Sequence, residues 1–312
     1  MGSPAATAVL VVGATGFIGR YASAHLAENG SRVVTSSRSG RHTDLACDLL
    51  DPASVETVLE RALPDAILVT AGNSSVGSAW EDPGASFETN TTGSFNLLEA
   101  VRRKAPAARV TLVSSATVYG PPASAAELPF TEGSPVRPAS PYGASKAAAE
   151  TLAGQYRRGF GIDVSIARIF NQIGPGQSEA QAPAEFARAI AEAEGKGQRK
   201  FDLEIGHPEA ERDFTDVRDT ARALAAIVTG SESGTFNICS GAGVRLYDIA
   251  AGLSAHTPLE IGVTKTPERA HPADVPLVVG SAARLKEATG WQPEIPLWIS
   301  LLDLLDDWRR RI

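Results

Sequence analysis

Short apolar runs alternate with longer amphipathic stretches over the first 170 residues of the chain. The stretches between the runs, such as residues 17–29 and 84–104, carry apolar residues at helical spacing. Strands that alternate with helices predict βαβ units, and unbroken apolar strands predict a parallel sheet covered on both faces. We therefore predict an α/β fold with a doubly wound parallel (Rossmann) sheet, which binds ligands at the carboxyl ends of its strands. The runs that predict strands are residues 8–12, 32–36, 66–70, 109–113 and 164–169.

The pattern changes after residue 170, where a loop-like segment is followed by a helical one at residues 183–194. Residues 215–229 and 235–239 again indicate a helix and a strand, so we expect this part to return to the main sheet. An amphipathic helix is predicted near the end of the chain, at residues 297–310. The expected division is a first domain of residues 1–170, joined by about 213–239, and a smaller C-terminal α/β lobe of residues 171–212 and 240–312.

Composition excludes several classes of partner. The net charge of −7 and the aromatic content of 6% argue against a nucleic acid or an anionic membrane surface. The sequence contains no run of 18 apolar residues, so we expect no membrane span. Two cysteines, Cys47 and Cys239, fit a reducing compartment, and the first residues lack the features of a signal peptide. We therefore expect a cytoplasmic protein, and we expect no metal site.

Three glycines, Gly13, Gly16 and Gly19, directly follow the first predicted strand and open the next helix. Glycine permits a tight turn there and lets backbone N–H groups at the helix start approach a pyrophosphate. The context predicts a dinucleotide-binding turn, and a purely structural βα turn is the alternative. The expected cofactor contacts here are Gly13, Thr15, Gly16, Phe17, Ile18 and Gly19, with Ala71 and Gly72 after the strand at 66–70.

The second predicted strand indicates which dinucleotide is bound. A site for NAD usually has an acidic residue near the end of this strand, whereas this chain has Ser37 and Arg38. A hydroxyl and a guanidinium group suit a 2′-phosphate, so we predict NADP(H), with NAD(H) left possible and a structural role for Arg38 as the alternative. Asp48, with Leu49, is expected to contact the adenine.

Two motifs indicate the chemistry. The segment "SSATVYG" (114–120) places hydroxyl groups, among them Ser115, at the end of a predicted buried strand. In "SPYGASK", Tyr142 and Lys146 are four residues apart on one face of a predicted helix. An ammonium close to a phenol lowers the pKa of the phenol, which then exchanges protons more readily near neutral pH. Ser115, Tyr142 and Lys146 are therefore the predicted catalytic residues.

These motifs, with "RIFNQIGPGQ", "ERDFTDVRDTARA", "FNICSG" and "RAHPADVPLVVG", resemble the extended short-chain dehydrogenases/reductases that act on nucleotide sugars. The resemblance covers nearly the whole chain and is strongest to the GDP-4-keto-6-deoxy-mannose reductases. It implies that Tyr142 is the acid/base, that Ser115 holds the substrate oxygen and that Lys146 bonds the nicotinamide ribose. It also implies a set of substrate contacts: Ser75, Ser115, Ala116, Thr117, Asn171, Arg212 and Arg269.

The arginines of that set, Arg212 and Arg269, would bind the nucleotide diphosphate, since each offers a fork of donors. Surface ion pairs are the alternative, for instance between Arg212 and Asp213 or Asp216. The resemblance further implies a homodimer built on helices around residues 85–104 and 141–158, and it makes the smaller lobe the substrate-binding part.

The reaction is indicated by a missing carboxylate. Sugar 4,6-dehydratases of this superfamily place an acid directly after the catalytic Ser or Thr, where this chain has Ala116 and Thr117. We therefore expect NADPH-dependent reduction of a 4-keto-6-deoxy sugar linked to a nucleotide. A 4-epimerase that retains NAD is the alternative, and a non-catalytic dinucleotide sensor is a third reading.

Overall fold

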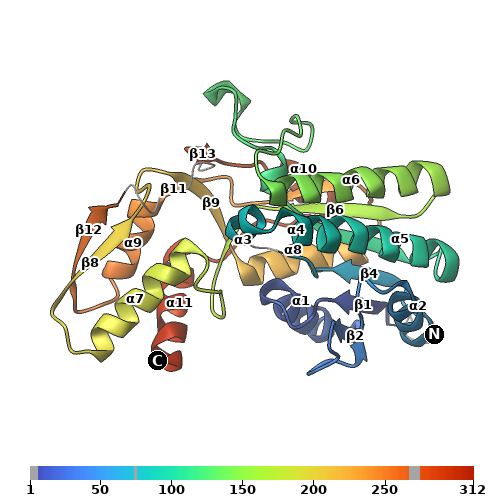
Figure 1. Ribbon diagram of the computed structural model, residues 1–312, viewed down its shortest axis with the longest axis horizontal. Helices are drawn as coiled ribbons and strands as arrows, with labels where there is room; N and C mark the ends of the chain where they lie inside the picture. The colour runs from blue at the N-terminus through green and yellow to red at the C-terminus, as the bar shows by residue number, and fades with distance from the viewer. Residues whose placement is uncertain (1–5, 74–75, 267–274) are drawn as a thin grey trace.

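The computed structural model describes residues 6–73, 76–266 and 275–312 (Figure 1). Its largest sheet has seven parallel strands in the order β10-β6-β5-β4-β1-β2-β3. From β1 the chain first moves outward to β2 and β3, then returns to the other side of β1 through β4. This reversal confirms the predicted doubly wound sheet and creates a crevice at the carboxyl ends of β1 and β4. The strands are β1 (Ala8–Val12), β2 (Arg32–Ser37), β3 (Leu45–Ala46), β4 (Ala66–Val69), β5 (Arg109–Ser115), β6 (Val164–Ile169) and β10 (Thr235–Ile238).

The central strands are buried along their whole length because helices cover both faces of the sheet. Val9 and Val11 of β1 pack with α1, α8 and α10, whereas Leu10 and Val12 point to the opposite face and pack with α2, α5 and α6. Alternate side chains thus serve two cores, which is why the strand reads as an unbroken apolar run. The helices are α1 (Phe17–Glu28), α2 (Pro52–Ala62), α5 (Gly93–Lys104), α6 (Pro141–Phe160), α8 (Val217–Thr229) and α10 (Ala283–Thr289).

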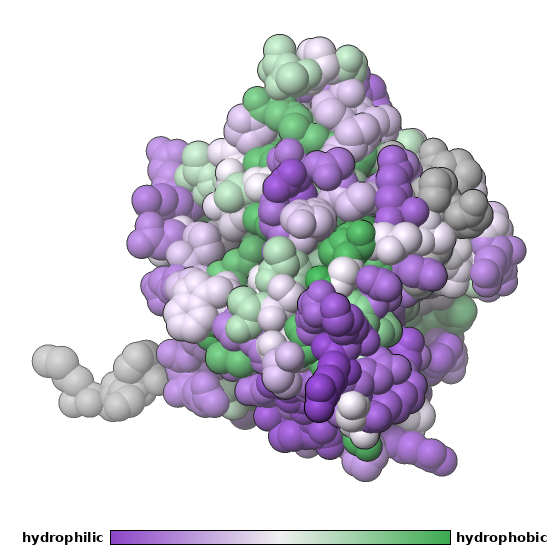
Figure 2. Space-filling view, turned by 90° about the vertical axis from the view of Figure 1, so that its left-hand side faces the viewer, coloured by the Kyte–Doolittle hydropathy of each residue, from purple (hydrophilic) through white to green (hydrophobic). Residues whose placement is uncertain are grey.

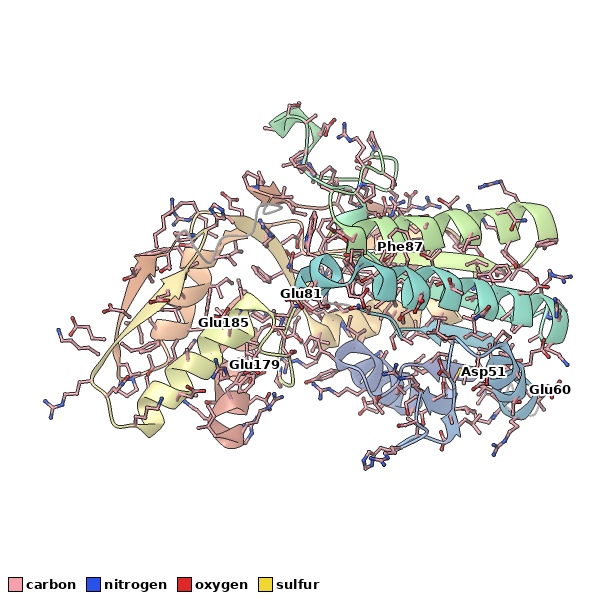
Figure 3. All side chains as sticks on the ribbon, viewed as in Figure 1. Asp51, Glu60, Glu81, Phe87, Glu179 and Glu185 are labelled. Atoms are coloured by element: carbon pink, nitrogen blue, oxygen red, sulfur yellow. The ribbon has the colours of Figure 1, made fainter. Side chains whose placement is uncertain are left out.

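Several helix starts are set by local sequence. Asp51, labelled in Figure 3, precedes α2 and its carboxylate accepts the Ala53 N–H at 3.0 Å. Ser140 does the same for α6 by accepting the Gly143 N–H at 3.1 Å, and Pro141 occupies the first helical position. Between β4 and α5 the chain forms α3 (Val76–Glu81), α4 (Pro83–Phe87) and a π-helical turn, η1 (Glu88–Thr92). Short 3₁₀ turns follow β5, at η2 (Ala116–Val118) and η3 (Ala125–Glu127).

A smaller lobe lies to one side of the large sheet (Figure 1). Strand β9 pairs with β7, β11 and β13, and a separate parallel pair is made by β8 and β12. Helices α7, α9 and α11 pack on these strands around their own hydrophobic core. Seen from this lobe, the surface mixes hydrophilic and hydrophobic residues (Figure 2). The lobe elements are β7 (Asn171–Ile173), α7 (Ala182–Gly195), β8 (Lys200–Ile205), β9 (Glu211–Asp216), β11 (Gly243–Arg245), α9 (Leu246–Ser254), β12 (Glu260–Lys265), β13 (Leu277–Val278) and α11 (Leu297–Arg311).

Helix α8 and strand β10 come from the segment expected to return to the first domain. Strand β10 joins the large sheet, and α8 packs on one face of it. Strand β9 directly precedes them and belongs to the smaller sheet. The boundaries that separate a first domain from a lobe stay a prediction. Within the described residues, no helix is long and apolar enough to cross a bilayer. Cys47 and Cys239 are buried free thiols.

Candidate active site

The glycine turn joins β1 to α1 at the crevice of the sheet. Gly13 has a φ of 93°, which L side chains rarely adopt, and its N–H donates to the Ser36 carbonyl at 2.9 Å. A Cβ on Gly19 would lie 2.2 Å from the Gly13 carbonyl oxygen, so only glycine lets α1 pack this close to the turn. The start of α1, with its N–H groups and the positive end of its dipole, therefore faces the crevice. That is an arrangement suited to a pyrophosphate.

A cavity of about 600 Å³ runs from this turn across the carboxyl ends of β1, β2, β4, β5 and β6. Its volume is in the range of cofactor and small-molecule sites. None of the described residues that line it is Asp or Glu. The cavity brings together most of the residues expected from the sequence: Gly13, Thr15, Gly16, Phe17, Ile18, Gly19, Ser37, Arg38, Ala71, Gly72, Ser115, Ala116, Thr117, Tyr142, Asn171 and Arg212.

Strand β5 ends at the hydroxyl cluster. The Ser115 hydroxyl oxygen caps η2 and accepts two hydrogen bonds from Thr117, at 3.2 Å from its N–H and at 3.0 Å from its hydroxyl. Ala116 between them is buried. Two adjacent hydroxyl groups therefore lie at the cavity wall, in a position to hold the oxygen of a ligand.

Helix α6 brings Tyr142 to the same wall. A Cβ on Gly143 would lie 2.7 Å from the Thr117 carbonyl oxygen, so glycine lets the first turn of α6 approach η2 closely. Tyr142 is 7% exposed, and its phenol is hydrogen bonded with the Ser115 side chain. Burial raises the pKa of the phenol to about 12, and the Ser115 hydrogen bond opposes that rise. Tyr142 therefore stays protonated and can act as a proton donor.

Lys146 lies one turn further along α6, where its ammonium donates to the Val113 carbonyl at 2.9 Å. Burial lowers its pKa to about 8, against the raising effect of the Glu150 carboxylate. The expected lowering of the Tyr142 pKa by Lys146 was wrong for this structure, since that pKa is raised. Burial dominates both groups and favours the neutral form of each.

Asn90 is a site residue that the sequence analysis missed. It is buried in the π-helical turn η1, where its amide N–H groups donate to the Asn73 carbonyl at 3.1 Å and to the Ser145 hydroxyl at 3.0 Å. Its side-chain oxygen accepts the Asn73 N–H at 3.0 Å. Asn90 thus ties the loop after β4 to the helix that carries Tyr142 and Lys146. The available signal was the run of Thr and Asn residues in "ETNTT", which are weak helix formers.

The lobe supplies the far wall of the cavity through Asn171 of β7 and Arg212 of β9. The Arg212 guanidinium donates to the backbone carbonyls of Glu211, at 2.9 Å, and Val275. Asp213 and Asp216, the two carboxylates expected as alternative ion-pair partners of Arg212, hydrogen bond with other groups. Asp213 accepts from Ser240, Gly241 and Gly280, and Asp216 accepts from Arg218 and Ser300.

Three other expected site residues are described but do not line this cavity. Lys146 lines a smaller void behind it, together with Ser114 and Glu150. The Asp48 carboxylate accepts the Leu50 N–H at 3.0 Å, and the Leu49 carbonyl accepts from the Asn96 side chain at 2.8 Å. Ser75 and Arg269 lie outside the described residues.

Known proteins resemble this chain over most of its length. Residues 10–298 match the family model described as GDP-mannose 4,6 dehydratase. The curated GDP-6-deoxy-D-mannose reductase of Pseudomonas aeruginosa is 35% identical over 305 residues, covering 97% of this chain and 98% of that protein.

Two solved structures superpose over almost their full length. The structure described as RMD from Pseudomonas aeruginosa complexed with NADPH has a TM-score of 0.87 and 34% identity, covering 98% of this chain and 99% of the other. The Thermus thermophilus UDP-glucose 4-epimerase in complex with NAD has a TM-score of 0.86 and 28% identity, covering 97% and 99%. The range matched by the family model, residues 10–298, contains the glycine turn, Ser115, Tyr142 and Lys146. This chain belongs to the extended short-chain dehydrogenase/reductase family of NAD(P)-dependent enzymes that act on nucleotide sugars.

Proposed function

We propose that the protein reduces the 4-keto group of a nucleotide-linked 4-keto-6-deoxy sugar with NADPH. The observation that carries the proposal is a buried, protonated Tyr142 beside the Ser115 hydroxyl, in a cavity whose described lining has no carboxylate. The bound dinucleotide would supply the hydride to the carbonyl carbon. Tyr142 would donate its hydroxyl proton to the carbonyl oxygen, which Ser115 and Thr117 would orient.

The residues at the cavity fit a dinucleotide with a 2′-phosphate. The start of α1 offers N–H groups for the pyrophosphate, and the Ser37 side chain and Arg38 line the end of the cavity beyond β2. Arg38 is exposed and makes no hydrogen bond or ion pair with any described residue, so its guanidinium is available for a phosphate. The relative from Pseudomonas aeruginosa is described as complexed with NADPH, which supports the same choice.

Dehydration is disfavoured by the residues at the site. A 4,6-dehydratase must remove a proton from carbon, and the two positions after Ser115 carry a methyl and a hydroxyl side chain. The described lining of the cavity offers no carboxylate that could remove this proton. Hydride exchange at C4 is what these residues can support.

The alternative that stays open is a nucleotide-sugar 4-epimerase, which the likeness to the Thermus enzyme favours. An epimerase oxidises and then reduces its substrate with one retained dinucleotide, so it consumes none. The two functions therefore separate in a simple assay. A non-catalytic sensor is a weaker candidate, because Tyr142 and Lys146 are both retained.

The test is to incubate the protein with NADPH and either GDP- or dTDP-4-keto-6-deoxyhexose and to follow the absorbance of NADPH. We expect oxidation of NADPH with one of the two nucleotide-sugar substrates, and faster turnover with NADPH than with NADH. Absence of oxidation with both substrates would contradict the proposal. Purified protein that retains NAD and interconverts UDP-sugars would favour the epimerase instead.

A further inference from the structure

Two glutamine side chains in the wall of the cavity have carbonyl oxygens without a donor. Gln172, on β7, is 9% exposed and Gln177, on the loop after β7, is 3% exposed. Neither side-chain oxygen has a hydrogen-bond partner among the described residues, and both are hidden from solvent. A buried carbonyl without a donor destabilises the folded protein, so a pair of them in one wall needs an explanation.

The partners of the two NH₂ groups determine which amide atom is nitrogen and which is oxygen. The Gln172 NH₂ donates to the Phe170 carbonyl at 3.2 Å, and the Gln177 NH₂ donates to the Gln172 backbone carbonyl at 2.7 Å. A backbone carbonyl can only accept, so exchanging nitrogen and oxygen in either amide would set two acceptors against each other. The unpartnered atoms are therefore carbonyl oxygens, which can only accept.

The segment that carries these residues is held in place. The Pro175 carbonyl accepts from Tyr21 at 2.9 Å and from Arg20 at 3.1 Å, both on α1. The next N–H, that of Gly176, donates to the Asp307 carboxylate at 2.6 Å. The loop after β7 is therefore anchored to α1 and α11, and the two glutamine oxygens lack donors in a segment that is held in place.

Both glutamines line the same cavity as Ser115 and Tyr142. Two carbonyl acceptors would repel phosphate oxygens, so these residues suit an uncharged part of a ligand that carries N–H or O–H groups. The nicotinamide carboxamide and the hydroxyl groups of the sugar have that chemistry.

We propose that Gln172 and Gln177 form an acceptor pair for N–H or O–H donors of the ligand bound beside Ser115 and Tyr142. This inference rests on the proposed function and adds the residues that hold the reacting end of the ligand. The oxygens are covered in this structure, so the proposal requires the two amides to shift toward the bound group, against the hydrogen bonds that their NH₂ groups now make. The hydrogen bonds formed favour that shift.

The test compares Gln172→Met and Gln177→Met, which remove the acceptors at similar side-chain length, with Gln198→Met as a control. Gln198 is exposed in the turn after α7 and does not line the cavity. We would measure the melting temperature without ligand, the Kd of NADPH by fluorescence, and the Kd of GDP-mannose or dTDP-glucose with NADP⁺ bound. Each cavity variant should weaken one ligand by about 3- to 10-fold, with no change in the control.

The outcomes separate the source of the donors. A higher Kd for NADPH identifies the carboxamide, and a higher Kd for the nucleotide sugar alone identifies its hydroxyl groups. Unchanged affinities for both ligands would overturn the inference, whether or not the melting temperature falls. Gln177→Asn, which keeps the amide and withdraws it by one methylene, should show the same loss if a Met variant does not fold. Wild-type protein that binds none of these ligands would contradict the proposed function itself.

Discussion

At the residue scale, the proposed reaction depends most on the Tyr142 hydroxyl. Tyr142→Phe removes the proton donor and leaves the ring in its buried position beside Ser115. We expect kcat to fall by about 10²- to 10⁴-fold while the Kd of NADPH stays within a factor of about three. Single-turnover kinetics and a fluorescence titration measure the two quantities. A variant with wild-type turnover would remove Tyr142 from the mechanism.

Lys146 predicts a pH dependence. Burial lowers its pKa to about 8, so the ammonium loses its proton as the pH rises through that value, whereas Tyr142, with a pKa of about 12, stays protonated. If the charged lysine binds the cofactor ribose, kcat/KM falls about tenfold per pH unit above pH 8. The profile from pH 6 to 10 measures this. A profile that is flat to pH 10 would contradict the role.

Arg38 predicts the choice of cofactor. Arg38→Ala removes an exposed guanidinium at the end of the cavity beyond β2, and no hydrogen bond or ion pair with a described residue is lost with it. We expect KM for NADPH to rise by about 10- to 100-fold and KM for NADH to change little, because only NADPH carries the 2′-phosphate. Equal effects on both cofactors would show that Arg38 does not read this phosphate.

At the scale of elements, the position of Tyr142 depends on how closely α6 packs on η2. A Cβ added at Gly143 would meet the Thr117 carbonyl at 2.7 Å, so Gly143→Ala must displace the start of the helix. We expect a loss of about 1–3 kcal/mol in the free energy of unfolding and at least a tenfold lower kcat. Denaturant unfolding and steady-state kinetics measure these effects.

Gly154→Ala is the matched control in the same helix. Its Cβ would meet only the far end of the flexible Arg158 side chain, at 3.0 Å. We expect unchanged kcat and equal or slightly higher stability, because alanine favours the helix. Similar losses in both variants would show that the close approach of α6 to η2 is not what places Tyr142.

Most strands of the large sheet could be predicted, most clearly β1 and β4, which are continuous apolar runs. The two-residue strand β3 was not among the predicted runs. The strands of the smaller lobe were missed, and β7 lies in the segment that was interpreted as loop-like. These strands are short, polar or half exposed, and they are fixed by pairing with distant segments. The π-helical turn at 88–92 was also missed, in a stretch that reads as one helix. Its position depends on the Asn90 hydrogen bonds to Asn73 and Ser145, which are tertiary contacts.

The candidate site was predictable where chemistry depends on spacing within one segment, as for Gly13 to Gly19 and for Tyr142 and Lys146. The direction of the Tyr142 pKa was not, because it depends on burial that several elements produce together. The Gln172 and Gln177 oxygens could not be foreseen either, since their lack of donors appears only when β7 and its loop are folded.

At the scale of the whole molecule, we propose a homodimer formed by α4, α5 and α6. Three large apolar side chains are exposed on these helices: Phe87, labelled in Figure 3, Phe95 and Phe160. Exposed aromatic residues of this kind are common at protein interfaces. Phe95→Glu should shift the sedimentation coefficient from dimer to monomer. Trp298→Glu, on α11 of the smaller lobe, should leave the dimer intact. Wild-type protein that sediments as a monomer would contradict the proposal.

The most direct test of the account follows the hydrogen that the reaction transfers. The protein is given NADPH with deuterium at both C4 positions of the nicotinamide, together with the nucleotide-linked 4-keto-6-deoxy sugar, and the product is examined by mass spectrometry and NMR. We predict one deuterium at C4 of the sugar for each NADPH consumed, and none with Tyr142→Phe on the same time scale. Product without deuterium at C4, or a sugar changed with no NADPH consumed, would contradict a ketoreductase.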